Sequence, residues 1–253
     1  MTASLDEVAR RGIVALEERG FAAWPALMTV LDDGWVIRLS RGHTKRANSI
    51  NVLGPSSEPL AEKCARAEAL LAWHGLPIVY RLSPLAPAEL TALLDQRRYE
   101  LIDDTRVMVA DLKPSAERPD PRVSVRAGVA PDWTAAYAAA DRVSVDRAAT
   151  LQQMMASIAP PHATAEVVDN GHRVAYGLGV VDRGMIGMFE ILVAPSHRRQ
   201  GLAAAIMAGL LDWGRRNGAR RSYLQVVASN SPAIALYERL GYREVYRYHY
   251  RVA

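Results

Sequence analysis

The stretch from Val193 to Met207 holds residue types that could bind a phosphate group. It follows an apolar, β-branched run, Met185–Val193, which has the composition of a buried strand. Pro195 lacks a backbone donor and ends this strand, and a basic turn with one glycine follows. Apolar residues then recur on one helical face: Leu202, Ile206, Leu210 and Trp213. The first N–H groups of such a helix have no intrahelical partner, so they favour an anion. An ordinary strand-to-helix connection is the alternative that this segment alone leaves open.

The turn itself carries a more specific pattern. It reads Arg198-Arg199-Gln200-Gly201-Leu202-Ala203, without the Gly-Lys-Ser/Thr ending of a Walker loop and with only one glycine of a Rossmann fingerprint. This pattern closely resembles the R/Q-x-x-G-x-G/A signature of the GCN5-related N-acetyltransferases. A second stretch, Leu224 to Tyr242, resembles that family's C-terminal motif: L-Q-V-V-A-S-N-S-P-A-I-A-L-Y-E-R-L-G-Y. The resemblance implies acetyl-CoA as the acyl donor, with its pyrophosphate at the turn.

Tyr237 lies in the second motif. Its position one turn after Ala233 and Ile234 would by itself favour a packing residue. The resemblance implies a general acid instead, because the family's acid is the tyrosine at this place in the motif. A phenol near the sulfur can protonate the coenzyme A thiolate as it leaves.

Glu190 is a carboxylate inside the otherwise apolar run M-F-E-I-L-V. A buried charge is costly unless it is paired, hydrated or functional. An acceptor amine arrives as an ammonium ion, so a carboxylate whose pKa is raised by burial could accept its proton, directly or through water. A salt-bridged or edge-facing glutamate is the alternative. Many peptide acetyltransferases of the family have a glutamate where this chain has Gln225, which weakens the prediction of a peptide N-terminus as acceptor.

The resemblance also assigns backbone groups. In the family's fold the strand before the turn and the strand after the helix splay apart, and N–H groups near Ile191, Leu192 and Val193 can stabilise the thioester oxygen. Asn230 could hydrogen-bond the pantetheine or phosphate arm, or cap the helix that follows it. The histidines have neither metal-ligand spacing nor a nucleophile–base pairing, so we expect no metal and a direct attack in a ternary complex.

The elements around these residues can be predicted from periodicity and turn signals. In the second half we expect a strand from Val123, a helix capped by Asp132, a helix at 145–158, strands at 163–168, 172–181, 185–193 and 222–227, a helix at 232–240 and a strand at 242–251. In the first half we expect a helix at 5–19 stopped by Gly20, a hairpin of 35–39 with 47–53, helices at 59–75 and 87–97, and strands at 78–82, 99–103 and 106–112. The alternating tyrosines of the last strand suggest domain packing or an acceptor-pocket wall.

The two halves repeat the same order of elements. The first half has G-P-S-S-E-P-L-A-E-K-C in place of the phosphate loop, with Glu58 and Glu62 where an anion would need positive potential, and Leu94 in place of the tyrosine acid. We therefore expect a degenerate acetyltransferase-like domain at 1–112, a proline-rich linker at 113–121 and a catalytic domain at 122–253. The fold class implied is α/β, with two tandem domains, each a mixed, mostly antiparallel sheet flanked by helices.

Composition limits the function further. The 253 residues are 50% hydrophobic, include one cysteine and carry a formal net charge of +4, which fits a phosphorylated ligand as well as nucleic acid. No apolar run reaches the length of a membrane span, and no signal peptide is evident, so we expect a cytoplasmic monomer or homodimer. The predicted activity is acetyl transfer to a primary amine, with small-molecule amines ranked above protein N-termini and both above nucleic acid. The alternatives are a peptide or protein N-terminal acetyltransferase and a non-catalytic acyl-CoA-binding module.

Overall fold

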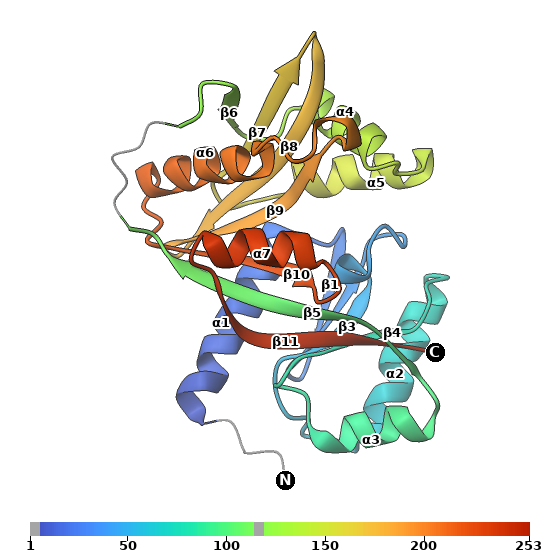
Figure 1. Cartoon of the computed structure of the whole chain (residues 1–253). Helices are drawn as coiled ribbons and strands as arrows, with labels where there is room; N and C mark the ends of the chain where they lie inside the picture. Colours follow the sequence, from blue (N-terminus) through green and yellow to red (C-terminus); the bar gives the residue numbers. More distant parts are fainter. Residues whose placement is uncertain (1–5, 114–118) are drawn as a thin grey trace. The chain divides into compact units, whose positions relative to one another are not determined.

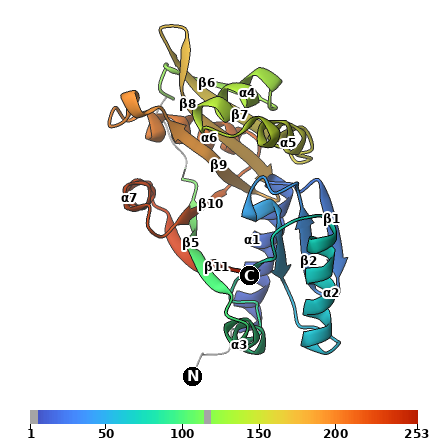
Figure 2. The same cartoon turned by 90° about the vertical axis from the view of Figure 1, so that its right-hand side faces the viewer.

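The computed structural model describes residues 6–113 and 119–253, which form two compact units (Figures 1 and 2). Unit 1 comprises the described residues of Met1–Arg106 together with Val227–Ser229 and Tyr246–Ala253. Unit 2 comprises those of Val107–Val226 together with Asn230–Val245. Of the predicted linker at 113–121, residues 114–118 lie outside the described part of the chain.

Unit 1 is a sheet with helices packed against it. Its elements are α1 (Glu7–Ala23), β1 (Met28–Asp32), β2 (Trp35–Leu39), β3 (Ser49–Val52), α2 (Leu60–Trp73), β4 (Val79–Leu82), α3 (Ala88–Gln96), β5 (Glu100–Asp111) and β11 (Arg243–Val252). The hydrogen-bonded strand order is β1-β2-β3-β4-β11-β5. Neighbours in the series β1, β2 and β3 are antiparallel, whereas β3 and β4, which α2 connects, are parallel. Apolar residues of β2, β3, β4, α2 and α3 form the core.

Unit 2 repeats this arrangement. Its further elements are β6 (Val123–Ala127), α4 (Pro131–Ala140), α5 (Val145–Ala156), β7 (His162–Asp169), β8 (His172–Asp182), β9 (Met185–Val193), α6 (Leu202–Arg216), β10 (Arg221–Val227) and α7 (Ser231–Arg239). The strand order is β5-β10-β9-β8-β7-β6, with β9 and β10 parallel and α6 between them in sequence. The series β7, β8, β9, α6, β10, α7 thus matches β1, β2, β3, α2, β4, α3. The predicted tandem fold of mixed sheets flanked by helices is confirmed.

The two units exchange strand segments. The second half of β5 belongs to unit 2, and the second half of β11, the last strand of the chain, belongs to unit 1. There β11 pairs antiparallel with β4, with His249 opposite Leu82. Tyr246, Tyr248 and Tyr250 are buried. The alternating tyrosines therefore pack inside unit 1, where they help to build its core.

Most predicted boundaries agree with the structure, and the differences have local causes. Gly20 does not stop the first helix: it is buried, and α1 continues until Trp24, whose N–H donates to the Gly20 carbonyl immediately before Pro25. The strands expected at 99–103 and 106–112 are one strand, β5, in which Asp103 has a φ of 52°. Strand β1 was not predicted, because most of its residues are exposed and its burial does not alternate.

Asp132 is not the cap of α4. The cap is Ala130, and Pro131 opens the helix, where its missing N–H is tolerated. Asp132 lies in the first turn and accepts a hydrogen bond of 2.6 Å from the Arg173 guanidinium.

Candidate active site

The centre of the candidate site is a bulge in β9. The pairing of β9 with β8 places Leu178 opposite Phe189 and Tyr176 opposite Leu192, so two residues of β9 lie opposite one residue of β8. One of the two is Glu190, whose φ is 52°. A bulge of this kind bends a strand and re-aims its side chains. It gives a reason why a charged residue interrupts the apolar strand.

The bulge coincides with the end of the parallel pairing between β9 and β10. That pairing runs from Met185 opposite Arg221 to Met188 opposite Leu224. Strand β9 continues for five more residues, Phe189–Val193, beyond this register. Ile191 to Val193, whose N–H groups were predicted to stabilise the thioester oxygen, therefore lie beyond the parallel pairing of β9 with β10.

The turn after β9 leads into the start of α6. Gly201 is the N-cap residue with a φ of 76°, and Arg199 also has a positive φ, 65°. The first backbone bond of the helix joins the Ala205 N–H to the Gly201 carbonyl at 3.0 Å. The N–H groups of Leu202, Ala203 and the residue after them therefore have no acceptor within the helix.

The surroundings of this helix start suit an anion. The first turn of α6 contains no acidic residue. Arg198, Arg199, Gln200 and Gly201 are all exposed. His197, just before them, lies 3.1 Å from the Asp169 carboxylate through Nε2. The turn thus presents backbone N–H groups without a helical partner and positive charge at a solvent-exposed position.

The corresponding turn of unit 1 is filled by a carboxylate of the protein itself. Asp33 Oδ2 accepts hydrogen bonds from the Ser57 N–H at 2.7 Å and the Ser57 hydroxyl at 2.9 Å. The Lys63 ammonium, which is fully buried, lies 3.1 Å from the same oxygen. These donors lower the pKa of Asp33 to about 2. The donors of Ser57 and Lys63, which could otherwise meet an external anion, are therefore already used within unit 1.

Glu190 is paired with a residue that sequence reasoning did not single out. The Tyr137 hydroxyl, on α4, donates a hydrogen bond to Glu190 Oε2. Asp141 Oδ2 lies 3.3 Å from the same hydroxyl. A phenol hydroxyl has one hydrogen, so it donates to one of the two carboxylates at a time, and the closer one is Glu190. Burial raises the pKa of Asp141.

Aromatic rings hold Tyr137 in place. Its ring stacks on Trp133 with centroids 5.5 Å apart and an interplanar angle of 5°. Tyr176 of β8 meets both rings edge-on, at 5.8 Å from Trp133 and 5.9 Å from Tyr137. We call Trp133, Tyr137 and Tyr176 the aromatic cluster. The i, i+4 spacing of Trp133 and Tyr137 was visible in the sequence, but their proximity to Glu190 depends on the packing of α4 on the sheet.

Tyr237 lies on the buried face of α7. Its side chain is 9% exposed, and its ring centroid lies 6.0 Å from that of Tyr242. No group in the described part of the chain forms a hydrogen bond with its hydroxyl. Burial raises the pKa of Tyr237, which keeps the phenol protonated at neutral pH.

Asn230 caps α7. Its Oδ1 accepts a hydrogen bond of 3.3 Å from the Ala233 N–H. The capping role that the sequence left open is therefore observed, and the amide nitrogen of the exposed side chain stays available for a ligand. Asn230 and Tyr237 come from α7, whereas Glu190 and Ile191–Val193 come from β9, all within unit 2.

Comparison with solved structures identifies this fold. A GCN5-related N-acetyltransferase from Kribbella flavida superposes with a TM-score of 0.66 at 18% identity, over 97% of this chain and 95% of that one. A tandem GNAT protein from the clavulanic acid biosynthesis pathway gives a TM-score of 0.64 at 14% identity, over 99% and 96% of the two chains. The fold is that of the GCN5-related N-acetyltransferases.

Sequence comparison gives the family. The model of the family described as "Probable histone acetyltransferase Rv0428c C-terminal" matches residues 11–251, and the chain belongs to this family. The uncharacterized N-acetyltransferase YobR of Bacillus subtilis is 28% identical over 241 residues, which is 94% of this chain and 97% of that protein. The ribosomal protein bS18-alanine N-acetyltransferase of Escherichia coli is 38% identical over 79 residues, 31% of this chain and 53% of that one. The resemblance inferred from the motifs is confirmed, and the chain is an N-acetyltransferase.

The described residues contain neither a metal site nor a membrane-spanning helix. They contain no group of three or more His, Cys, Asp or Glu side chains arranged to hold a metal ion. None of the helices at 6–113 or 119–253 is long and apolar enough to cross a membrane.

Proposed function

We propose that this enzyme transfers an acetyl group from acetyl-CoA to the primary amine of a small cationic molecule, by direct attack in a ternary complex. The observation that carries the proposal is the bulge at Glu190, where the parallel ladder of β9 and β10 ends. It supports a site in which an acyl donor reaches the open backbone of β9 while a carboxylate is available to the acceptor. In this proposal the chemistry belongs to the second domain, residues 122–253, and the domain at 1–112 is degenerate.

The residues at the start of α6 fit the donor. The pyrophosphate of acetyl-CoA would bind at Arg198–Ala203, where N–H groups without helical partners meet exposed guanidinium groups. Gly201 adopts a positive φ there without a Cβ penalty. Asn230 would donate its amide N–H to the pantetheine or phosphate arm while its oxygen caps α7.

The chemical step needs two protons to leave the acceptor nitrogen and one to reach the thiolate. Glu190 takes a proton from the ammonium form of the acceptor, and the amine nitrogen forms a bond to the thioester carbon. N–H groups of Ile191–Val193 stabilise the negative charge that develops on the carbonyl oxygen. The carbon–sulfur bond then breaks and Tyr237 protonates the departing thiolate. The nitrogen, which still carries one proton too many, releases it to solvent to give the amide, and the Tyr237 phenolate takes up a proton from solvent. The raised pKa of Tyr237 supports this role, because the residue must carry its proton at the start of the step.

The surroundings of Glu190 support a compact, positively charged acceptor. The carboxylates Glu190 and Asp141 meet at the Tyr137 hydroxyl, beside the buried aromatic cluster, and negative charge there would attract an ammonium group. Gln225, which cannot accept a proton, stands where peptide acetyltransferases of this superfamily carry a glutamate. Both features favour a small-molecule amine over a protein N-terminus.

A protein N-terminus is the second candidate acceptor. It is favoured by the 38% identity, over 79 residues, with an enzyme named for acetylating the alanine of ribosomal protein bS18. The two candidates differ in the acceptor and share the donor and the proposed proton transfers.

A thiol-release assay with acetyl-CoA and a panel of acceptors tests the proposal. The panel combines small diamines and amino sugars with peptides that begin with alanine, serine and methionine. We expect release with at least one small amine and a large loss of kcat in the Tyr237→Phe variant. Tight coenzyme binding with no release on any acceptor would contradict the catalytic assignment, and release on the peptides alone would select the second candidate.

A further inference from the structure

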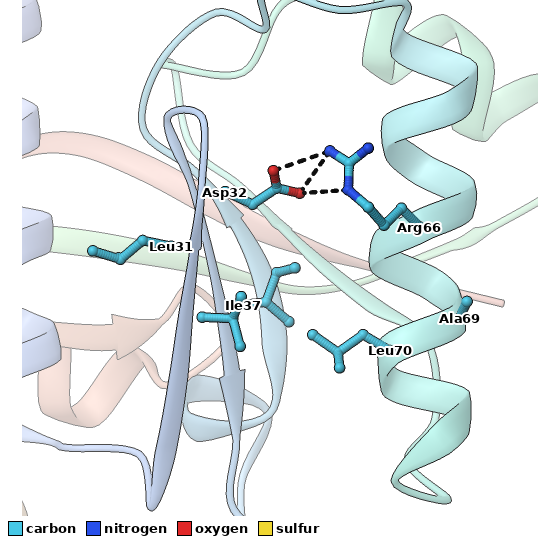
Figure 3. Close-up of a pocket in the computed structure, with 7 residues that line it drawn as sticks. Leu31, Asp32, Ile37, Arg66, Ala69 and Leu70 are labelled. Atoms are coloured by element: carbon cyan, nitrogen blue, oxygen red, sulfur yellow. Dashed lines mark hydrogen bonds and ion pairs between the residues drawn. The ribbon is translucent and has the colours of Figure 1, made fainter.

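Unit 1 contains an open groove between β1 and α2 (Figure 3). It has a volume of about 480 Å³. Val30 and Ile37 line it from the strands, and Ala69 and Leu70 line it from the helix. One end is closed by Arg66, whose guanidinium lies 3.0 Å from Asp32 Oδ1. The groove is therefore apolar along its length and polar only at this end.

Large apolar side chains around the groove are exposed to solvent. Val30 is 39% exposed, Met28 is 45% exposed and Leu31 is 78% exposed, all on β1. Trp73, which follows Leu70 by three residues and so lies on the same side of α2, is 86% exposed. An exposed apolar cluster that contains a tryptophan is characteristic of a protein–protein contact.

Unit 2 shows what fills the same place in the other copy of the fold. There β7, the counterpart of β1, pairs antiparallel with a further strand, β6. Val123 and Val125 of β6 pack against α6 so closely that a Cβ on Gly209 would lie 3.1 Å from each of them. In unit 1, β1 ends the strand order, and none of the described residues pairs with its outer edge. The groove is the place of a missing strand.

We propose that a second copy of this chain supplies that strand, through antiparallel pairing of β1 with β1 of the partner about a twofold axis. The residues of β1 that face α2, Met28 and Val30, repeat the apolar alternation with which Val123 and Val125 fill unit 2. Full overlap of the five-residue strand places Val30 opposite the partner's Val30 and Met28 opposite the partner's Asp32. No like-charged side chains then lie opposite each other, and the outer edge of β1 is hydrogen-bonded in both copies. This interface is independent of the proposed acetyl-transfer site.

Sedimentation equilibrium between about 1 and about 100 µM protein, the range of common homodimer affinities, tests the interface. We expect the mass to rise from 27.7 kDa towards twice that value. Val30→Lys places a charge in the groove and should keep the protein monomeric over the whole range. Val8→Lys is the matched control, because Val8 is 81% exposed on α1, away from the groove, and it should assemble like the unmodified protein. A monomer at every concentration, or unchanged assembly of Val30→Lys, would overturn the proposal.

A cross-linking variant decides the question even if Val30→Lys does not fold. The chain has one cysteine, Cys64, which is buried, so a new surface thiol has no competitor. The twofold arrangement brings two copies of residue 30 together, so Val30→Cys should form an intermolecular disulfide under mild oxidation much faster than Val8→Cys. Equal rates in the two variants would show that β1 does not pair with β1 of a second copy. The same result is expected if a different protein occupies the groove, and it would overturn the proposal.

Discussion

The Tyr137 hydroxyl donates a hydrogen bond to the Glu190 carboxylate and links helix α4 to the bulge in β9. The two residues are separated by 53 positions in the sequence. The bulge turns the glutamate out of the regular alternation of the strand, and the aromatic stack on Trp133 fixes the phenol that meets it. Tyr137 thereby becomes a positioning residue for the proposed base.

Removing this hydroxyl should leave the proposed base without the contact that positions it. In Tyr137→Phe the ring and its stacking remain, but the ionised form of Glu190 loses a hydrogen bond, which contributes about 1.5–3 kcal/mol when one partner is charged. We expect kcat to fall by about 10-fold or more with little change in the KM for acetyl-CoA, because the carboxylate is no longer held in place. Tyr176→Phe is the control, because the Tyr176 hydroxyl donates to the Arg173 carbonyl instead of Glu190. An equal fall of kcat in both variants would point to a general loosening of the cluster.

The start of α6 should bind the donor mainly through its backbone. Gly201→Glu adds a negative charge and a side chain at a φ of 76°, so it should abolish binding of coenzyme A. Arg199→Ala removes one charged hydrogen bond and should cost about 1–3 kcal/mol of binding free energy. Isothermal titration calorimetry with coenzyme A measures both. Comparable losses would mean that side chains, and not the N–H groups, hold the pyrophosphate.

Tyr237 should set the alkaline limit of activity. Burial raises its pKa, and the acid role requires the protonated phenol, so kcat should hold beyond the ordinary tyrosine value of about 10 and fall only above the raised pKa. Tyr237→Phe should lower kcat by about 100-fold, at the lower end of general-acid contributions, and remove this limb. The pH profile of kcat is the measurement. An unchanged alkaline limb in the variant would assign it to another group.

A buried ion pair between Glu17 of α1 and Arg81 of β4, which Tyr246 of β11 joins, should stabilise unit 1. Arg81 and Glu17 are 4% and 1% exposed, and the Tyr246 hydroxyl donates to the other Glu17 oxygen at 2.5 Å. Glu17→Gln leaves the Arg81 charge buried without its partner, which should cost about 3–5 kcal/mol of unfolding free energy.

Chemical denaturation measures this loss. Glu7→Gln, on the same helix, breaks an exposed pair with Arg11 and should cost less than about 1 kcal/mol. Equal losses of unfolding free energy in the two variants would show that the buried pair stabilises the protein no more than the exposed pair does.

Local patterns in the sequence were enough to predict the fold class and the bounds of the elements around the proposed donor site. The strand at 185–193 has the predicted bounds, because its apolar residues, interrupted only at Glu190, are buried in the first half and half-buried in the second. The helix after it begins at Leu202 and ends at Arg216, because Gly201 and Asn217-Gly218 supply the backbone conformations that helix ends need. Such signals lie within a few residues of the element that they define.

Other features were decided by tertiary structure alone. The stop assigned to Gly20 was wrong because packing in unit 1 keeps that glycine inside α1. The partner of Glu190 could not be predicted, because it depends on how α4 packs on β8 and β9. The same holds for Asp33, whose carboxylate fills the turn at Ser57 from 24 residues away.

The sequence by itself determined that this chain is a tandem N-acetyltransferase of the GCN5-related superfamily, since that information lies in short, contiguous motifs. Only the tertiary structure decided that β5 and β11 are shared between the units, that Tyr137 meets Glu190, and that β1 has an open edge. These depend on the pairing of segments far apart in the chain, which is set by the total burial and hydrogen bonding of the folded protein.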